Sequence, residues 1–175
     1  MTGENLRSTF LDGEQIKEAL PALLTTGLLN TCVIAALAGL FGSALALALS
    51  KLGASRLPGL RAMTRLHVHV FRGLPVILTV MLIGQGLPMA GVHLLGRDGF
   101  PYAVLVLAPV NAAYLSEIIR SGMQSVEREL VEAALTFGMT ERQATNRIVL
   151  PLGIRRVLPA LANQFIVVVK ETSLV

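Results

Sequence analysis

The stretch Glu132–Pro151, EAALTFGMTERQATNRIVLP, is a polar and charged island between apolar segments of the chain. Apolar residues from Glu127 to Phe137 recur at helical spacing, and Gly138 stands where a helix would end in a left-handed residue. Thr140 and Gln143 form a T-x-x-Q capping box that opens a second helix, and the proline at the end of the stretch is expected to stop that helix. The stretch therefore predicts a helical hairpin.

The composition places this hairpin in a membrane protein. Hydrophobic residues make up 53% of the chain and charged residues 15%, with a mean hydropathy of +0.66, whereas a soluble domain is about 25% charged. Between Glu18 and Lys51 the thiol of Cys32 is the one ionisable side chain, and we expect this cysteine to be a small buried hydrophobe. This apolar stretch exceeds the roughly 20 residues that a helix needs to cross a bilayer.

Small residues recur at every fourth position in the first apolar segment, about residues 22–50. Such stripes let a second helix approach closely, although a span rich in Gly and Ala is also common in membranes, and both interpretations stay open. The two stripes are Ala35, Gly39 and Ser43, and Ala38, Gly42 and Ala46.

The basic residues predict the orientation of the chain in the membrane. The loop Lys51–Arg72 has no acidic residue and contains Lys51, Arg56, Arg61, Arg65 and Arg72. By the positive-inside rule this loop is cytoplasmic, so the N-terminus lies outside. The second basic region, residues 121–156, then falls on the cytoplasmic side as well, because three expected spans separate it from the N-terminus.

The expected fold is all-α and polytopic, with an extracytoplasmic segment, 1–20, followed by one transmembrane domain, 21–175. Because Lys170 and Glu171 lie in the last apolar run just before the sequence ends, we expect a further C-terminal part with one more span, which would make five. The four visible spans are expected at about 22–50, 72–88, 101–119 and 157–175, with the cytoplasmic hairpin at 121–156.

Seven positions of the hairpin fit the pattern EAA-x3-G-x9-I-x-L-P: Glu132, Ala133, Ala134, Gly138, Ile148, Leu150 and Pro151. In this pattern the chain resembles the permease subunits of bacterial ABC importers. Further stretches are similar to the polar amino acid subfamily, namely FRGLP at 71–75, AYLSEI at 113–118, GMQSV at 122–126, NQF at 163–165 and KETSL at 170–174. The resemblance covers the chain from about residue 22 to its end.

The resemblance implies a type I importer-like permease that translocates a polar amino acid across the bacterial inner membrane. In this family, cytoplasmic ATPase subunits receive the hairpin in a groove, and ATP-driven closure of the ATPase dimer rotates the membrane helices. The implied coupling residues are Glu132, Ala133, Ala134, Gly138, Met139, Thr140, Arg142, Ile148, Leu150 and Pro151.

The residue types suggest roles within this coupling hairpin. The small side chains of Ala133 and Ala134 are expected to let its two helices approach each other closely. The carboxylate of Glu132 is expected to pair with Arg142 or Arg147, or with a group on the ATPase. Direct contact with the partner is expected at Glu132 and between Met139 and Gln143.

The chain lacks a phosphate-cradling Gly-x4-Gly-Lys-Ser/Thr loop, so ATP hydrolysis is expected in a separate subunit and the permease itself is not expected to be an enzyme. No cofactor or metal is expected. The implied partners are ABC ATPase subunits, a second permease that is identical or a paralogue, an extracytoplasmic solute-binding protein and membrane lipid. Nucleic acid is not expected, because the basic residues sit beside apolar spans.

A substrate path should contain polar or ionisable side chains at membrane depth. A zwitterionic amino acid needs an anion for its ammonium group and a donor for its carboxylate. Two of the candidates also allow structural interpretations, since Arg72 can extend to the interface and Glu117 can pair with Arg120. The candidates are Arg72, Asn111, Glu117, Lys170 and Glu171.

Two other functions remain open from the sequence. One is an ABC importer permease for another small solute, such as a quaternary amine or a peptide. The other is a non-transporting membrane anchor or sensor that retains a coupling-like loop. A secondary transporter is disfavoured, because the cytoplasmic motif would have no role in it and the sequence has no obvious inverted repeat.

Overall fold

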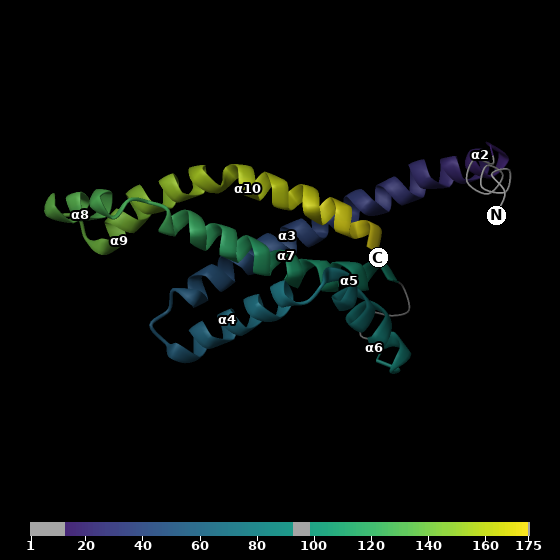
Figure 1. The fold of residues 1–175 in the computed structure, drawn as a ribbon, viewed down its shortest axis with the longest axis horizontal. Helices are drawn as coiled ribbons and strands as arrows, with labels where there is room; N and C mark the ends of the chain where they lie inside the picture. The colour runs from purple at the N-terminus through teal and green to yellow at the C-terminus, as the bar shows by residue number, and fades with distance from the viewer. Residues whose placement is uncertain (1–12, 93–98, 175) are drawn as a thin grey trace, which may run out of the picture.

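The computed structural model describes residues 13–92 and 99–174, and every regular element in these two ranges is a helix (Figure 1). Short π-helical segments widen three of the long helices, and a 3-10 turn ends the last one. The elements are α2 Gly13–Ala22, η1 Leu23–Gly27, α3 Leu28–Gly53, α4 Pro58–Gly73, α5 Val76–Thr79, η2 Val80–Gln85, α6 Gly86–Met89, α7 Gly99–Gln124, α8 Arg128–Thr136, α9 Glu141–Ala144, η3 Thr145–Val149, α10 Leu150–Glu171 and η4 Thr172–Leu174.

The helices α3, α7 and α10 form the bundle, and α7 packs against both of the others. Small residues make these contacts close. Ala38, Gly42 and Ala46 are all buried, and a β-carbon on Gly42 would lie 3.0 Å from the carbonyl oxygen of Ala108 on α7. This stripe is therefore a packing surface. The other predicted stripe, Ala35, Gly39 and Ser43, is not buried throughout, since Ser43 is exposed.

Among residues 13–92 and 99–174, three helices are long and apolar enough to cross a membrane, namely Lys17–Gly53, Gly99–Gln124 and Glu141–Leu174. A fourth span is present if the bent pair Pro58–Gly73 and Val76–Met89 counts as one. The all-α, polytopic class is thereby confirmed. Part of the expected N-terminal segment, residues 1–12, lies outside the described residues, and so do residues 93–98, between the second and third expected spans.

The expectation of a loop over Lys51–Arg72 is wrong for most of its length, because Pro58–Gly73 is the helix α4. Pro58 occupies the first turn of this helix, where its missing N–H and fixed φ are tolerated. The helix ends ahead of Pro75, which holds Leu74 in an extended conformation (φ −94°, ψ 136°). The chain bends there by 106° before α5.

The prediction that Pro151 stops a helix is also wrong. The chain is helical from Glu141 to Leu174, and Pro151 lies near the start of α10. The preceding residues Thr145–Val149 form a π-helical turn in which the N–H of Leu150 bonds to the carbonyl oxygen of Thr145. This wider turn ends two residues before Pro151, the residue that has no N–H, and the helix continues with a local change of spacing instead of ending.

The hairpin α8–α9 lies at one end of the molecule, and α2 lies at the opposite end (Figure 1). The connection between α3 and α4 is on the same side as the hairpin (Figure 1). The two arginine-rich regions therefore share one end of the structure. Cys32, by contrast, is exposed on α3, so the expectation that it is buried is wrong. An apolar helix in a membrane protein can turn a given face either to other helices or to its exterior, and the sequence around Cys32 does not distinguish the two.

Candidate functional site

The turn of the hairpin is built around Gly138, which has φ +84°. The N–H of Met139 bonds to the carbonyl oxygen of Ala134 at 3.1 Å, and the N–H of Gly138 bonds to that of Leu135 at 3.0 Å. These two bonds form a Schellman motif, in which a left-handed residue lets the last carbonyl groups of α8 find donors. The predicted left-handed end of the first helix is confirmed.

The second helix of the hairpin starts at the predicted capping box. The N–H of Gln143 donates to the hydroxyl oxygen of Thr140 at 3.3 Å, and the N–H of Thr140 donates to the amide oxygen of Gln143 at 2.9 Å. Both bonds satisfy donors that the first turn of a helix leaves open. The Schellman motif and the capping box lie next to each other, so the path of the turn is fixed by backbone hydrogen bonds on one side and by side-chain caps on the other.

The two alanines of the motif have different environments. Ala134 is 5% exposed, and α8 packs against α9 and against the segment Thr145–Val149. Ala133 is exposed, because neighbouring residues on a helix point about 100° apart. Close approach of the two helices therefore depends on Ala134, and the role predicted for Ala133 in this approach is wrong.

The predicted pairing of Glu132 with Arg142 or Arg147 is also wrong. Its carboxylate accepts from Nε of Arg128 at 3.0 Å, one turn earlier on the same helix. Residues four apart on a helix are neighbours, and this local partner is reached without bridging the hairpin. Both side chains are exposed, so the pair contributes little to stability and leaves Glu132 accessible.

The remaining coupling candidates lie along the second arm of the hairpin. Thr140, Arg142, Leu150 and Pro151 are exposed, whereas Met139 and Ile148 are half-buried. A residue outside the predicted set is the most exposed large apolar side chain of the hairpin: Phe137, at its tip, is 88% exposed. Apolar side chains at a loop tip are a sequence signal that could have identified Phe137, but the motif itself does not include its position.

The hairpin is tied to the bundle by contacts that the sequence did not indicate. Arg156 on α10 donates from Nη1 to the carbonyl oxygen of Ser125, and its Nη2 lies 3.4 Å from Oε1 of Glu127. Nearby, a β-carbon on Gly122 of α7 would lie 2.8 Å from the carbonyl oxygen of Gly153 on α10. The backbones of α7 and α10 thus touch immediately beside the start of the hairpin.

A cavity of about 850 Å³ lies between the C-terminal part of α3, one face of α4 and the C-terminal half of α7. We refer to it as the α4 cavity. His67 anchors α4 beside it, since its Nε2 lies 3.2 Å from the carbonyl oxygen of Pro109 on α7. The charged side chains of the lining are Arg61, Arg65, Arg72, Glu117 and Arg120, with His69 as a further titratable group.

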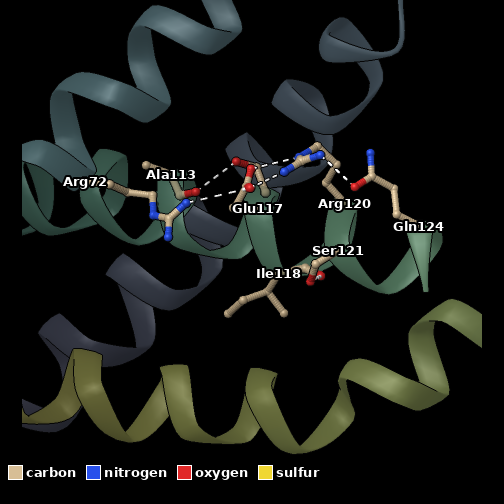
Figure 2. A network of polar contacts seen from close by, with 8 residues as sticks. Arg72, Ala113, Glu117, Ile118, Arg120, Ser121 and Gln124 are labelled. Carbon is tan, nitrogen blue, oxygen red and sulfur yellow. Dashed lines mark hydrogen bonds and ion pairs between the residues drawn. The ribbon is translucent and has the colours of Figure 1, made fainter.

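The α4 cavity brings two of the five substrate-path candidates together, Arg72 and Glu117 (Figure 2). Nη1 of Arg72 lies 3.8 Å from Oε1 of Glu117, and its guanidinium lies over the ring of Tyr114, 5.4 Å from the centroid. Arg120 donates from Nε to Glu117 Oε2 at 2.9 Å and from Nη1 to Gln124 at 2.8 Å. The predicted pairing of Glu117 with Arg120 is confirmed.

The other three candidates lie elsewhere. Asn111 is 2% exposed at the crossing of the bundle helices, where its amide oxygen accepts from Nε2 of Gln164 on α10 at 3.3 Å. Lys170 is exposed near the end of α10. Glu171 is half-buried, and within the described part of the chain its buried Oε2 has no hydrogen-bond partner. The five residues therefore do not form a single site.

A family model described as "Binding-protein-dependent transport system inner membrane component" matches residues 38–175. The chain is 37% identical over 164 residues to the probable amino-acid permease protein YxeN of Bacillus subtilis, covering 94% of this chain and 73% of YxeN. It is also 37% identical over 164 residues to the probable amino-acid ABC transporter permease protein PatM of Vibrio harveyi, covering 93% and 73% of the two chains.

A solved structure is similar as well. It is a crystal structure of an amino acid ABC transporter with histidines, which is 31% identical in sequence and superposes with a TM-score of 0.82. The match covers 91% of this chain and 72% of the chain in the crystal.

Proposed function

The chain belongs to the binding-protein-dependent transport system inner membrane components, as an ABC importer permease of the polar amino acid group, and we propose that it moves a polar amino acid across the bacterial inner membrane by coupling to a cytoplasmic ATPase through the hairpin α8–α9. Members of this family are multi-pass membrane proteins and transporter subunits. A permease of this kind is not itself an enzyme.

The observation that carries the proposal is the hairpin at one end of the molecule, with Phe137 88% exposed at its tip (Figure 1). An aromatic side chain of this size on a small, hydrogen-bonded turn is suited to fill a pocket on a partner, where buried aromatic anchors supply much of the binding energy. Leu130 and Leu135 of α8 are exposed as well. These residues support an apolar docking surface, with Glu132 and Arg142 as its charged neighbours.

The orientation of the hairpin supports a cytoplasmic partner. The hairpin and the connection between α3 and α4 lie at the same end, and both regions are rich in arginine (Figure 1). Under the positive-inside rule this end faces the cytoplasm. An ATPase subunit on this side would have access to ATP and would meet the tip of the hairpin first.

The contacts at the base of the hairpin support transmission of motion into the membrane. Arg156 links α10 to Ser125 and Glu127, which lead into α8. Gly122 and Gly153 hold the backbones of α7 and α10 together one turn away. A displacement of α8 would therefore move two membrane helices at once, because the backbones of α7 and α10 are in contact at these two glycines.

The α4 cavity supports a polar station on the substrate path. Arg72 offers donors for a substrate carboxylate, while the carboxylate of Glu117 is already shared between Arg72 and Arg120. A substrate ammonium group would therefore compete with Arg120 for Glu117. We place Asn111 in helix packing, because its amide is engaged with Gln164, and we place Lys170 and Glu171 at a second station, toward the opposite end of the bundle.

The proposed assembly contains two permeases, identical or paralogous, on two ATPase subunits, with an extracytoplasmic solute-binding protein. Proteoliposomes that hold this assembly should accumulate a polar amino acid in an ATP-dependent manner. Uptake of a quaternary amine or a peptide alone would instead support the alternative importer. A complex in which the chain changes neither ATP hydrolysis nor the uptake of any of these solutes would contradict the proposal and favour an anchor or sensor.

A pair of variants separates coupling from folding in the same assay. Phe137→Ala should lower substrate-stimulated ATP hydrolysis and uptake together, because both require the docked hairpin. Met89→Ala is a matched control, since Met89 is 87% exposed on α6, outside the hairpin. Equal activity of the two variants would show that the tip of the hairpin is not a docking anchor.

A further inference from the structure

The α4 cavity carries more positive charge than its one carboxylate can balance. Arg61, Arg65, Arg72 and Arg120 line it together with Glu117. The ion pairs of Glu117 are with Arg72 and Arg120. Within the described residues, no carboxylate oxygen lies within 4 Å of the guanidinium of Arg61 or Arg65, so two arginines face the cavity without an anionic partner.

The helix α4 is amphipathic, with these two arginines on one face and exposed apolar side chains on the opposite face. Arg61 and Arg65 are four residues apart and share the face that lines the cavity. Met63, Leu66 and Val70 recur at spacings of three and four on the other side of the helix, and all three are exposed. The helix thus has one apolar face outward and one basic face toward α3 and α7, an arrangement typical of helices at a membrane interface.

We propose that the α4 cavity binds a phosphate group, supplied by the headgroup of an anionic phospholipid or by a soluble phosphate. The planar guanidinium fork matches phosphate oxygens in a bidentate manner. Basic pockets between membrane helices on the cytoplasmic side are suited to anionic headgroups. A cavity of about 850 Å³ also falls within the range of small-molecule sites, about 300–1,000 Å³.

The proposed phosphate contact falls on Arg61 and Arg65, in the first half of α4. The network of Arg72, Glu117 and Arg120 continues the same cavity on the side of α7 (Figure 2). A bound phosphate would offset the repulsion among the arginines and hold α4 against α3 and α7. The two arginines line the same cavity as the proposed polar station of Arg72 and Glu117, so the proposal rests in part on the proposed function, but its test measures phosphate binding and not transport.

Native mass spectrometry of the purified full chain in detergent tests the proposal directly. Phosphatidylglycerol should bind in preference to phosphatidylcholine. The double variant Arg61→Gln/Arg65→Gln should bind phosphatidylglycerol about 30-fold more weakly, since two basic groups are removed from the site. Arg61→Lys/Arg65→Lys keeps the charge and should retain most of the binding, which separates lost charge from lost folding.

A second double variant, Arg147→Gln/Arg155→Gln, removes the same charge from exposed positions outside the cavity and should bind like the wild type. Inorganic phosphate that binds with the same dependence on Arg61 and Arg65, and displaces the lipid, would identify a soluble anion as the ligand. Equal binding of phosphatidylcholine and phosphatidylglycerol, or equal weakening by the two glutamine variants, would overturn the proposal.

Discussion

Replacement of Gly138 by alanine should loosen the hairpin through the backbone alone. The residue has φ +84°, and a β-carbon built on it would meet nothing within 4 Å. The cost is therefore the left-handed conformation itself, about 1–2 kcal/mol for a residue with a β-carbon. If the turn opens locally, this cost corresponds to about 5- to 30-fold faster hydrogen exchange at the amides of the turn.

The assay is hydrogen–deuterium exchange of peptides that cover residues 134–140, with the N–H of Met139 as the reporter of the Schellman bond. Gly138→Asn should accelerate exchange less than Gly138→Ala, because asparagine tolerates the left-handed region better. Gly91 is a matched control, since its φ is +80° and its β-carbon would also meet nothing within 4 Å.

Gly91→Ala should leave exchange in the hairpin unchanged and accelerate it near Val92, whose N–H bonds to Leu87. The reasoning would be refuted if Gly138→Ala changed exchange in the hairpin less than twofold, or if asparagine accelerated it more than alanine.

Three further predictions concern packing and capping. Gly122→Ala should lower the midpoint of thermal unfolding in detergent, because its β-carbon would lie 2.8 Å from a backbone oxygen of α10 and such overpacking costs about 1–3 kcal/mol. Gly39→Ala is the control, since its β-carbon would lie 3.8 Å from its nearest neighbour. Equal midpoints of the two variants would contradict the close contact. A double-mutant cycle of Asn111→Ala and Gln164→Ala should give a coupling free energy of about 0.6–1.7 kcal/mol, as for other hydrogen bonds between membrane helices, and strict additivity would exclude a stabilising bond. Thr140→Ala should destabilise the start of α9 by about 0.5–2 kcal/mol, which would be measured as faster amide hydrogen exchange there. Thr140→Ser should keep these amides protected from exchange. An equal loss of protection in both variants would argue against the cap.

Local signals in the sequence predicted the hairpin closely. A glycine after an amphipathic stretch and a T-x-x-Q sequence each specify hydrogen bonds within a few residues, so Gly138 and Thr140 behave as expected. Pro151 shows the limit of such a signal. A proline removes one donor, but a π-helical turn ahead of it let the helix continue.

Local sequence signals could not predict the contacts between segments that are distant in the chain. The sequence predicted a partner for Glu132 across the hairpin, whereas its carboxylate pairs with Arg128 on its own helix. The contact of Gly122 with Gly153, and the bond of Arg156 to Ser125, depend on how α7 and α10 cross, which no local pattern encodes. The sequence did not indicate the α4 cavity for a related reason, because one of its walls is the helix Pro58–Gly73, in a segment for which the basic residues predicted a loop.

Photo-crosslinking at the tip of the hairpin tests the central claim most directly. A benzophenone amino acid would replace Phe137 in one variant and Met89 in the other, two positions that are 88% and 87% exposed. In membranes that contain the assembled importer, the account predicts a crosslink from position 137 to the ATPase subunit and none from position 89. No crosslink from position 137, or equal crosslinks from both, would contradict a hairpin that docks on the ATPase.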